Sequence, residues 1–109
     1  MKVLLDACVP RPLRKYLTEH VIQTAQEMGW GQLKNGALLQ EAETEFNVLI
    51  STDQNLKSQQ NLIGRKLAIL VLPTNDWPMI RSKAEVIAIK VAGLKPGDFV
   101  ELHWDSPST

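Results

Sequence analysis

Two aspartates, Asp6 and Asp53, stand at the ends of short apolar runs, residues 3–5 and residues 48–50. Runs of this kind are typical of strands buried on both faces of a parallel sheet. If the two strands are neighbours, their carboxyl ends bring both carboxylates to the edge where open α/β sheets bind ligands. Carboxylates held close together repel each other unless a cation compensates, and Mg²⁺ and Mn²⁺ prefer such hard oxygen ligands. The spacing therefore predicts a divalent metal site.

A bound ion of this type can activate water and neutralise the charge that develops on a phosphate. The alternative for each aspartate is a purely local role, in which its side chain caps the next helix or turn. The sequence contains no phosphate-cradling glycine loop, no Ser-His-Asp arrangement and no HExxH pair. If the chain has a catalytic centre, we expect it at these two carboxylates.

The elements that would position the aspartates follow from apolar periodicity and from turn-forming residues. Strands are expected at residues 3–5, 21–24, 48–50, 67–72 and 99–103; helices at 12–20, 37–46 and 77–92; one helical turn at 25–28; and a loop with a short helix at 54–63. This alternation predicts a three-layer α/β/α sandwich with a mostly parallel, roughly five-stranded sheet. We expect one domain over residues 1–104 and a frayed tail over residues 105–109.

Length and charge restrict the class of protein further. The 109 residues fit one domain, and twelve Lys and Arg offset twelve Asp and Glu, so the formal net charge is zero. This balance argues against a polybasic protein that binds nucleic acid through bulk charge. The single cysteine, Cys8, excludes an internal disulfide and a cysteine-based zinc cluster. The absence of a signal-like or membrane-length apolar run predicts a cytoplasmic protein.

Several segments, taken together and in order, resemble the PIN-like superfamily. The matching segments are Val3-Leu4-Leu5-Asp6 with Val9-Pro10, Gly29-Trp30-Gly31 before Asn35-Gly36-Ala37-Leu38-Leu39, Thr52-Asp53-Gln54-Asn55-Leu56, Gln59-Gln60-Asn61-Leu62 with Gly64-Arg65, the strand at residues 67–72, and Lys95-Pro96-Gly97. More narrowly, the chain is similar to a small uncharacterised family related to VapC-type toxin ribonucleases. The resemblance covers nearly the whole chain and implies a PIN-like fold.

The resemblance also implies an activity, hydrolysis of RNA phosphodiesters by a Mg²⁺- or Mn²⁺-dependent endoribonuclease, often the toxin of a toxin–antitoxin pair. Asp6 and Asp53 would be its metal ligands and catalytic residues. Asn35 stands where relatives often have an acidic residue, and would offer a neutral carbonyl ligand. Asn55 and Asn61 would support the site or contact the RNA. An antitoxin protein would be the natural partner.

Two departures from the family pattern leave other functions open. Ala7 and Cys8 replace a common Glu-Asn pair, and Asn35 brings no charge, so Mg²⁺ affinity is expected to be lower. One alternative is a weakened module that binds RNA or an antitoxin without cleavage. Another is an interaction protein whose helix at residues 77–92 packs against a second copy as a homodimer. Cys8 itself is expected to be a small buried filler.

Basic and aromatic residues suggest contacts to an RNA strand. Two basic groups follow the first and third predicted strands: Arg11, Arg14 and Lys15, then Lys57, Arg65 and Lys66. If both lie at one edge they can hold backbone phosphates, with Arg11 or Lys57 steadying the strand to be cut. The alternative is an ordinary solvated surface. Trp30 either stacks on a base or anchors its loop to the core, and the second role is favoured.

Overall fold

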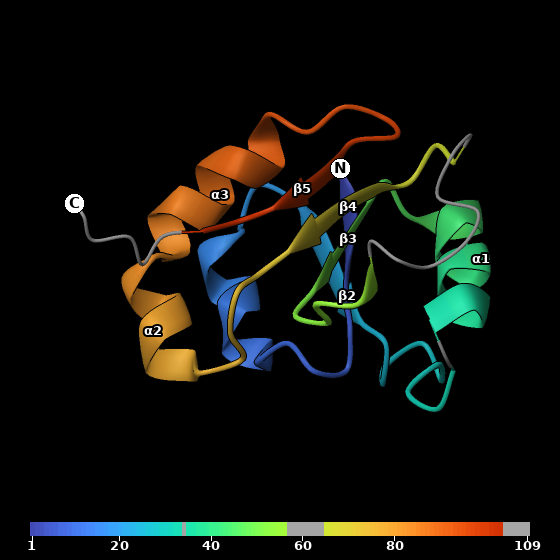
Figure 1. Ribbon diagram of the computed structural model, residues 1–109, viewed down its shortest axis with the longest axis horizontal. Coiled ribbons are helices and arrows are strands. Elements are labelled where there is room, and N and C mark those ends of the chain that lie inside the picture. Colours follow the sequence, from blue (N-terminus) through green and yellow to red (C-terminus); the bar gives the residue numbers. More distant parts are fainter. Residues whose placement is uncertain (34, 57–64, 104–109) are drawn as a thin grey trace.

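The sheet is the centre of the molecule. The computed structural model describes residues 1–33, 35–56 and 65–103, and of Asn35 it describes the backbone alone. Within these residues a five-stranded sheet comprises β1 (Lys2–Leu5), β2 (Val21–Thr24), β3 (Val48–Ser51), β4 (Ala68–Val71) and β5 (Phe99–Glu101). The spatial order is β2-β1-β3-β4-β5, and every neighbouring pair is parallel (Figure 1). The predicted sheet is confirmed, and it is parallel throughout.

Helices cover both faces of this sheet. One face carries the 3₁₀ helix η1 (Arg11–Tyr16) with α2 (Trp77–Ser82) and α3 (Ala84–Ala92), and the other carries α1 (Asn35–Glu45) (Figure 1). Alternate strand residues point to opposite faces, so Ile50 packs toward α2 and α3 whereas Leu49 packs toward α1. Both are buried. The continuous apolar strands therefore belong to a three-layer α/β sandwich, as expected.

The first predicted helix, at residues 12–20, is wrong in type and length. The chain forms only six residues of 3₁₀ helix, with bonds from the Leu13 amide to the Pro10 carbonyl and from the Leu17 amide to the Arg14 carbonyl. Pro12 has no amide hydrogen, which suits the first turn of such a short segment. Leu13 and Leu17 are buried as the periodicity predicts, but 45% of Tyr16 is exposed.

The long helix predicted at residues 77–92 is divided at Lys83. α2 begins at the cap residue Asp76, whose carboxylate accepts a hydrogen bond from the Met79 amide. Its last turn tightens into a bond from the Lys83 amide to the Ile80 carbonyl, and Lys83 leaves helical geometry at φ −115° and ψ 15°. The final strand is also shorter than the predicted 99–103, because β5 ends at Glu101.

Several predictions fall on residues that the structure does not describe: most of the segment at 54–63, with Lys57 and Asn61 in it, the tail at 105–109, and the side chain of Asn35. Across the described ranges, no helix combines the length and the apolar character needed to span a bilayer.

Candidate functional site

The two predicted catalytic aspartates lie at the same edge of the sheet. β1 pairs with β3 in the register Leu5 to Ile50, and the Asp6 amide donates to the Ile50 carbonyl at 2.9 Å. Asp6 follows β1 directly and Asp53 follows β3 by two residues, so both occupy the carboxyl end of neighbouring strands. We call this region, from Asp6 to Ala7 and from Ser51 to Asn55, the carboxyl edge. It is half-buried at both aspartates.

The strand order puts the carboxyl edge at the topological switch point of the sheet. β1 continues into η1 on one face of the sheet, whereas β3 continues toward Leu56, which packs on the opposite face with α1. Connections leaving the sheet in opposite directions open a crevice between the two strands, and ligands of open α/β sheets bind at this switch point. The adjacency of β1 and β3, which the sequence could state only as a condition, is therefore present.

Ser51 connects the two aspartates, and the sequence analysis missed it. Its side chain is fully buried, and its hydroxyl donates to Oδ2 of Asp6 at 2.8 Å. The Ser51 hydroxyl oxygen in turn accepts a hydrogen bond from the backbone N–H of Asp53 at 3.1 Å. The available signal was a serine at the end of an apolar strand, where a polar group needs partners when buried. Ser51 thus fixes the position of the Asp6 carboxylate relative to the backbone at Asp53.

Each carboxylate also has a local hydrogen bond. The backbone N–H of Ala7 donates to Oδ1 of Asp6 at 2.7 Å, and the backbone N–H of Asn55 donates to Oδ1 of Asp53 at 2.9 Å. The second bond is the side-chain-to-backbone turn that the capping alternative predicts for Asp53. Asp6 and Asp53 therefore each form a local hydrogen bond and also lie at the same edge of the sheet. Asn55 itself is exposed.

Cys8 is not the buried filler that the sequence predicts, because it is exposed. The turn after Asp6 carries it out of the core, and Val9 is buried in its place. Its Sγ lies 3.7 Å from the Ser51 hydroxyl and accepts the Thr52 amide at 3.5 Å. Since the one hydroxyl hydrogen of Ser51 is directed at Asp6, the thiol hydrogen of Cys8 is the donor to Ser51.

The donor set at the carboxyl edge fits a hard divalent cation only in part. Carboxylate oxygens are the preferred ligands of Mg²⁺, which retains several waters and binds through as few as one or two carboxylates. Asp6 and Asp53 supply that minimum. Within the described part of the chain, no group of three or more His, Cys, Asp or Glu residues is arranged to hold a metal ion. Asn35 begins α1, but its side chain lies outside the described residues.

Two of the described basic residues, Arg65 and Lys66, do not lie at the carboxyl edge, where the RNA-contact hypothesis requires them. Arg65 pairs with Glu43 at 2.9 Å, and the Lys66 amide donates to the same carboxylate. Both precede β4 and so lie at the opposite, amino edge, because parallel strands all begin on one side. Lys57, like Asn61, lies outside the described residues. Arg11 is exposed in the connection after β1 and keeps its predicted place.

Arg14 is held by an ion pair that the sequence analysis did not anticipate. Its guanidinium donates to both carboxylate oxygens of Glu27, at 2.9 and 2.7 Å, and to the Ile22 carbonyl at 3.1 Å. The Arg14 hydrogen bonds, followed by the Thr24 amide, lower the pKa of Glu27 from 4.5 to about 2. The same pairing raises the pKa of Arg14. Thr24 and Glu27 cap each other reciprocally around the turn after β2, the Ser/Thr-x-x-Glu pattern of a capping box.

Trp30 has the anchoring role that the sequence analysis favoured. It is half-buried, packs against the core between the sheet and α1, and meets Phe46 edge to face at a centroid distance of 6.1 Å. Its amide donates to the Ala25 carbonyl at 2.8 Å. Gly29 immediately before it has φ 79°, a conformation that favours glycine. This packing leaves less of the ring available to stack on a base.

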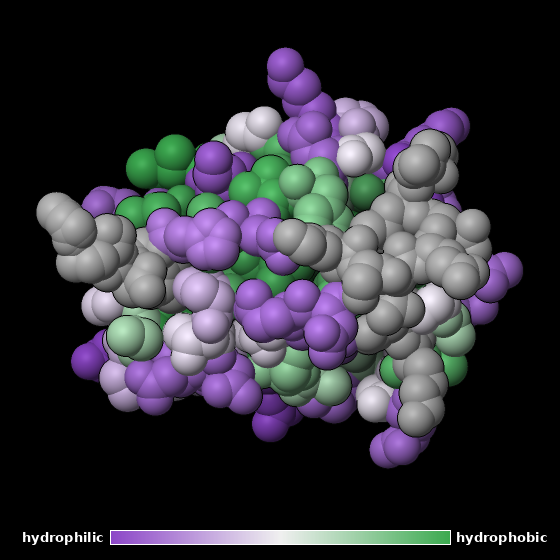
Figure 2. Space-filling model, viewed as in Figure 1, coloured by the Kyte–Doolittle hydropathy of each residue, from purple (hydrophilic) through white to green (hydrophobic). Residues whose placement is uncertain are grey.

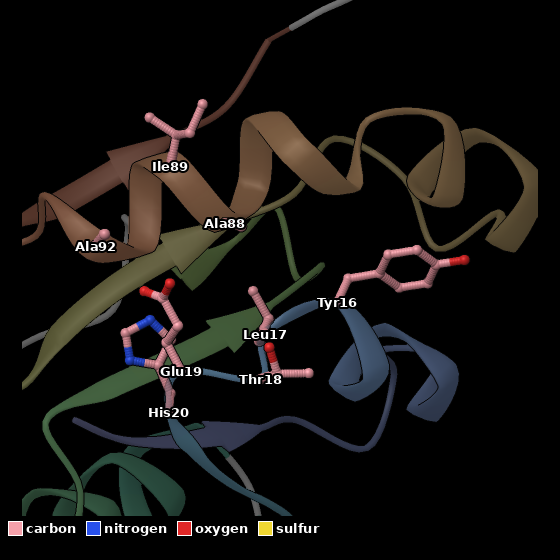
Figure 3. A pocket seen from close by; sticks show the side chains of 8 residues that line it. All are labelled: Tyr16, Leu17, Thr18, Glu19, His20, Ala88, Ile89 and Ala92. Carbon is pink, nitrogen blue, oxygen red and sulfur yellow. The ribbon is translucent and has the colours of Figure 1, made fainter.

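A separate cavity of about 240 Å³ lies away from the carboxyl edge (Figure 3). It is lined by residues 16–20 and, from α3, by Ala88, Ile89 and Ala92. Asp6 and Asp53 do not line it. The cavity therefore belongs to a different part of the surface from the candidate site.

The fold and the site together define a parallel α/β protein with an acidic switch-point edge. No protein-family model matches the chain, and no curated protein or solved structure is significantly similar to it. The resemblance to the PIN-like superfamily therefore stays a prediction based on the sequence segments.

Proposed function

We propose that this chain is a metal-dependent endoribonuclease of the PIN-like type, with its site at the carboxyl edge. The observation that carries the proposal is the parallel pairing of β1 with β3, which puts Asp6 and Asp53 at the switch point of the sheet. RNA is the proposed substrate and an antitoxin protein the proposed partner. The cytoplasm is the proposed compartment.

Asp6 and Asp53 would hold the Mg²⁺ or Mn²⁺ ion, with Asn35 as a neutral third ligand. When bound, the ion supplies activation of water and stabilisation of charge on the phosphate. The Ser51 hydroxyl and the Ala7 amide orient the Asp6 carboxylate, and the Asn55 amide orients that of Asp53. Arg11, exposed after β1, supplies a cation for the RNA backbone.

A second candidate is a binding module that holds RNA or an antitoxin without cleaving. It is favoured by the small number of acidic ligands, because the affinity of a site for hard cations rises with the number of carboxylates. Within the described residues, the carboxyl edge as defined above contains two carboxylates, those of Asp6 and Asp53. Ala7 and Cys8 add no carboxylate to it.

Metal binding separates the nuclease from the binding module and from a purely structural protein. Calorimetric titration with Mn²⁺ is expected to give a binding isotherm for the wild type and none for Asp53→Ala. Glu41→Gln is the matched control, because Glu41 is an exposed carboxylate on α1 and its loss is expected to leave binding unchanged. If the wild type shows no heat of Mn²⁺ binding, the nuclease proposal is wrong.

Cleavage separates the nuclease from the binding module. With Mn²⁺ present, the wild type is expected to cut single-stranded RNA, whereas Asp6→Asn is expected to be inactive. RNA that is bound but not cut, measured by fluorescence anisotropy on the same samples, would identify the binding module instead.

A further inference from the structure

The outer face of α3 presents hydrophobic side chains to solvent. Ile89 is 70% exposed and Val86 is 45% exposed, whereas Ile87 and Val91 on the same helix are fully buried against the sheet. Figure 3 shows the Ile89 side chain extending outward from α3. Figure 2 shows hydrophobic surface on the side of the molecule occupied by α3 in Figure 1. Because Ile87 and Val91 hold the opposite side of the helix against the sheet, Val86 and Ile89 face away from it.

Charged residues flank this apolar pair in a regular arrangement. Successive residues of an α-helix are turned by about 100° and rise by about 1.5 Å. Around the outer face of α3 the order is therefore Glu85, Ile89, Val86, Lys90, with the apolar residues inside and the opposite charges outside. All four are exposed, and neither charge forms an ion pair with another residue in the described ranges.

We propose that the surface formed by Glu85, Val86, Ile89 and Lys90 is a homodimer interface whose occupant is the same surface of a second copy. A two-fold axis running along the line from Val86 to Ile89 places these side chains against their own counterparts. The same rotation exchanges the two sides of the face, so Glu85 of each copy meets Lys90 of the other. The surface is thus complementary to itself in both hydrophobicity and charge.

The overall charge and the size of the surface set the strength of this association. The formal net charge is zero, so two copies do not repel each other at long range. Two apolar residues per copy bury less than a permanent dimer requires, so we expect a dissociation constant on the order of 100 µM. This inference is independent of the proposed nuclease function, because none of its four residues belongs to the carboxyl edge or lines the candidate site.

Sedimentation equilibrium over about 5 µM to 1 mM, a range bracketing the expected constant, tests the interface. The wild type is expected to shift from monomer to dimer, and Ile89→Glu to raise the dissociation constant at least about tenfold. The control is Val21→Glu, which alters an equally accessible residue, 58% exposed, on the edge strand β2 and is expected to leave dimerisation unchanged. Circular dichroism confirms that each variant is folded.

Charge reversal tests the pairing itself. Glu85→Lys is expected to weaken the dimer about tenfold, since both symmetry-related pairs become repulsive, and Glu85→Lys with Lys90→Glu is expected to restore it. A wild type that stays monomeric at 1 mM overturns the proposal. A dimer that survives Ile89→Glu, or that only Val21→Glu dissociates, overturns it as well, because another surface then forms the contact.

Discussion

Replacing Ser51 with alanine removes the hydroxyl that joins the two sides of the carboxyl edge. In the wild type this buried group donates to Oδ2 of Asp6 and accepts the amide of Asp53. In the variant, the backbone N–H of Asp53 loses the Ser51 hydroxyl as an acceptor, and the Asp6 carboxylate loses one charge-assisted hydrogen bond. Alanine fits the same space, so the effect comes from hydrogen bonding and not from packing.

The expected loss of stability follows from these two bonds, because the third partner of the Ser51 hydroxyl, the Cys8 thiol at 3.7 Å, is only a weak donor. A hydrogen bond to a charged group contributes about 1.5–3 kcal/mol and a neutral one about 0.5–1.5 kcal/mol. Asp6 is half-buried, so part of its loss is recovered by water. We expect Ser51→Ala to lower the free energy of unfolding by about 2–3 kcal/mol, which corresponds to a fall in Tm of about 10 °C for a domain of this size.

Urea denaturation at pH 7, followed by circular dichroism, measures this change. Ser82→Ala is the matched control, since the hydroxyl of Ser82 is exposed and donates only to the Met79 carbonyl, and we expect it to cost less than about 0.5 kcal/mol. A double-mutant cycle with Asp6→Ala should give a coupling energy of about 1–2 kcal/mol. A Ser51→Ala variant as stable as the control would refute the assigned hydrogen bonds.

Three further predictions test other parts of the fold. The folded-state pKa of Glu27 is lowered from 4.5 to about 2, so the pair with Arg14 stabilises the fold above pH 4.5 and that contribution is lost as the pH falls toward 2. Glu27→Gln should flatten the pH dependence of Tm between these pH values. An unchanged profile would contradict the pairing. Ile87→Ala should cost about 2–5 kcal/mol in urea denaturation at low protein concentration, whereas Ile89→Ala should cost less than about 0.5 kcal/mol, and equal losses would contradict the orientation of α3. Gly97→Ala should lower the free energy of unfolding by about 1–3 kcal/mol in the same assay, because Gly97 has φ 84° and a Cβ there would lie 3.1 Å from the Arg65 carbonyl oxygen. A variant as stable as the wild type would contradict this turn geometry.

Periodicity was a reliable guide where burial was uniform along an element. Residues 48–50 are buried at every position, and their continuous apolar run predicts this directly. It was less reliable where local geometry competes with hydrophobicity. Leu13 and Leu17 have the spacing of an α-helix, but prolines and a short connection leave a 3₁₀ helix. The apolar pattern at residues 77–92 likewise continues through Lys83, where the backbone turns and the helix ends.

Prediction of the candidate site depended on contacts that local sequence does not encode. The types of Asp6 and Asp53 and their place after strands were evident from the chain alone. Their partner Ser51 was not, because the value of a buried hydroxyl depends on what the neighbouring strand places beside it. Arg65 shows the same problem, since its position after the third strand gave no sign that it turns to Glu43 at the amino edge.

The sequence by itself determined the class of fold and the chemical character of the aspartates, because hydrophobic periodicity and side-chain type are properties of each segment. Only the tertiary structure decided that β1 lies beside β3, that Ser51 joins their ends, and that Ile89 faces solvent while Ile87 faces the sheet. These are decided by the pairing of strands 45 residues apart and by how a helix rotates onto its sheet, which depend on the free energy of the whole packed core.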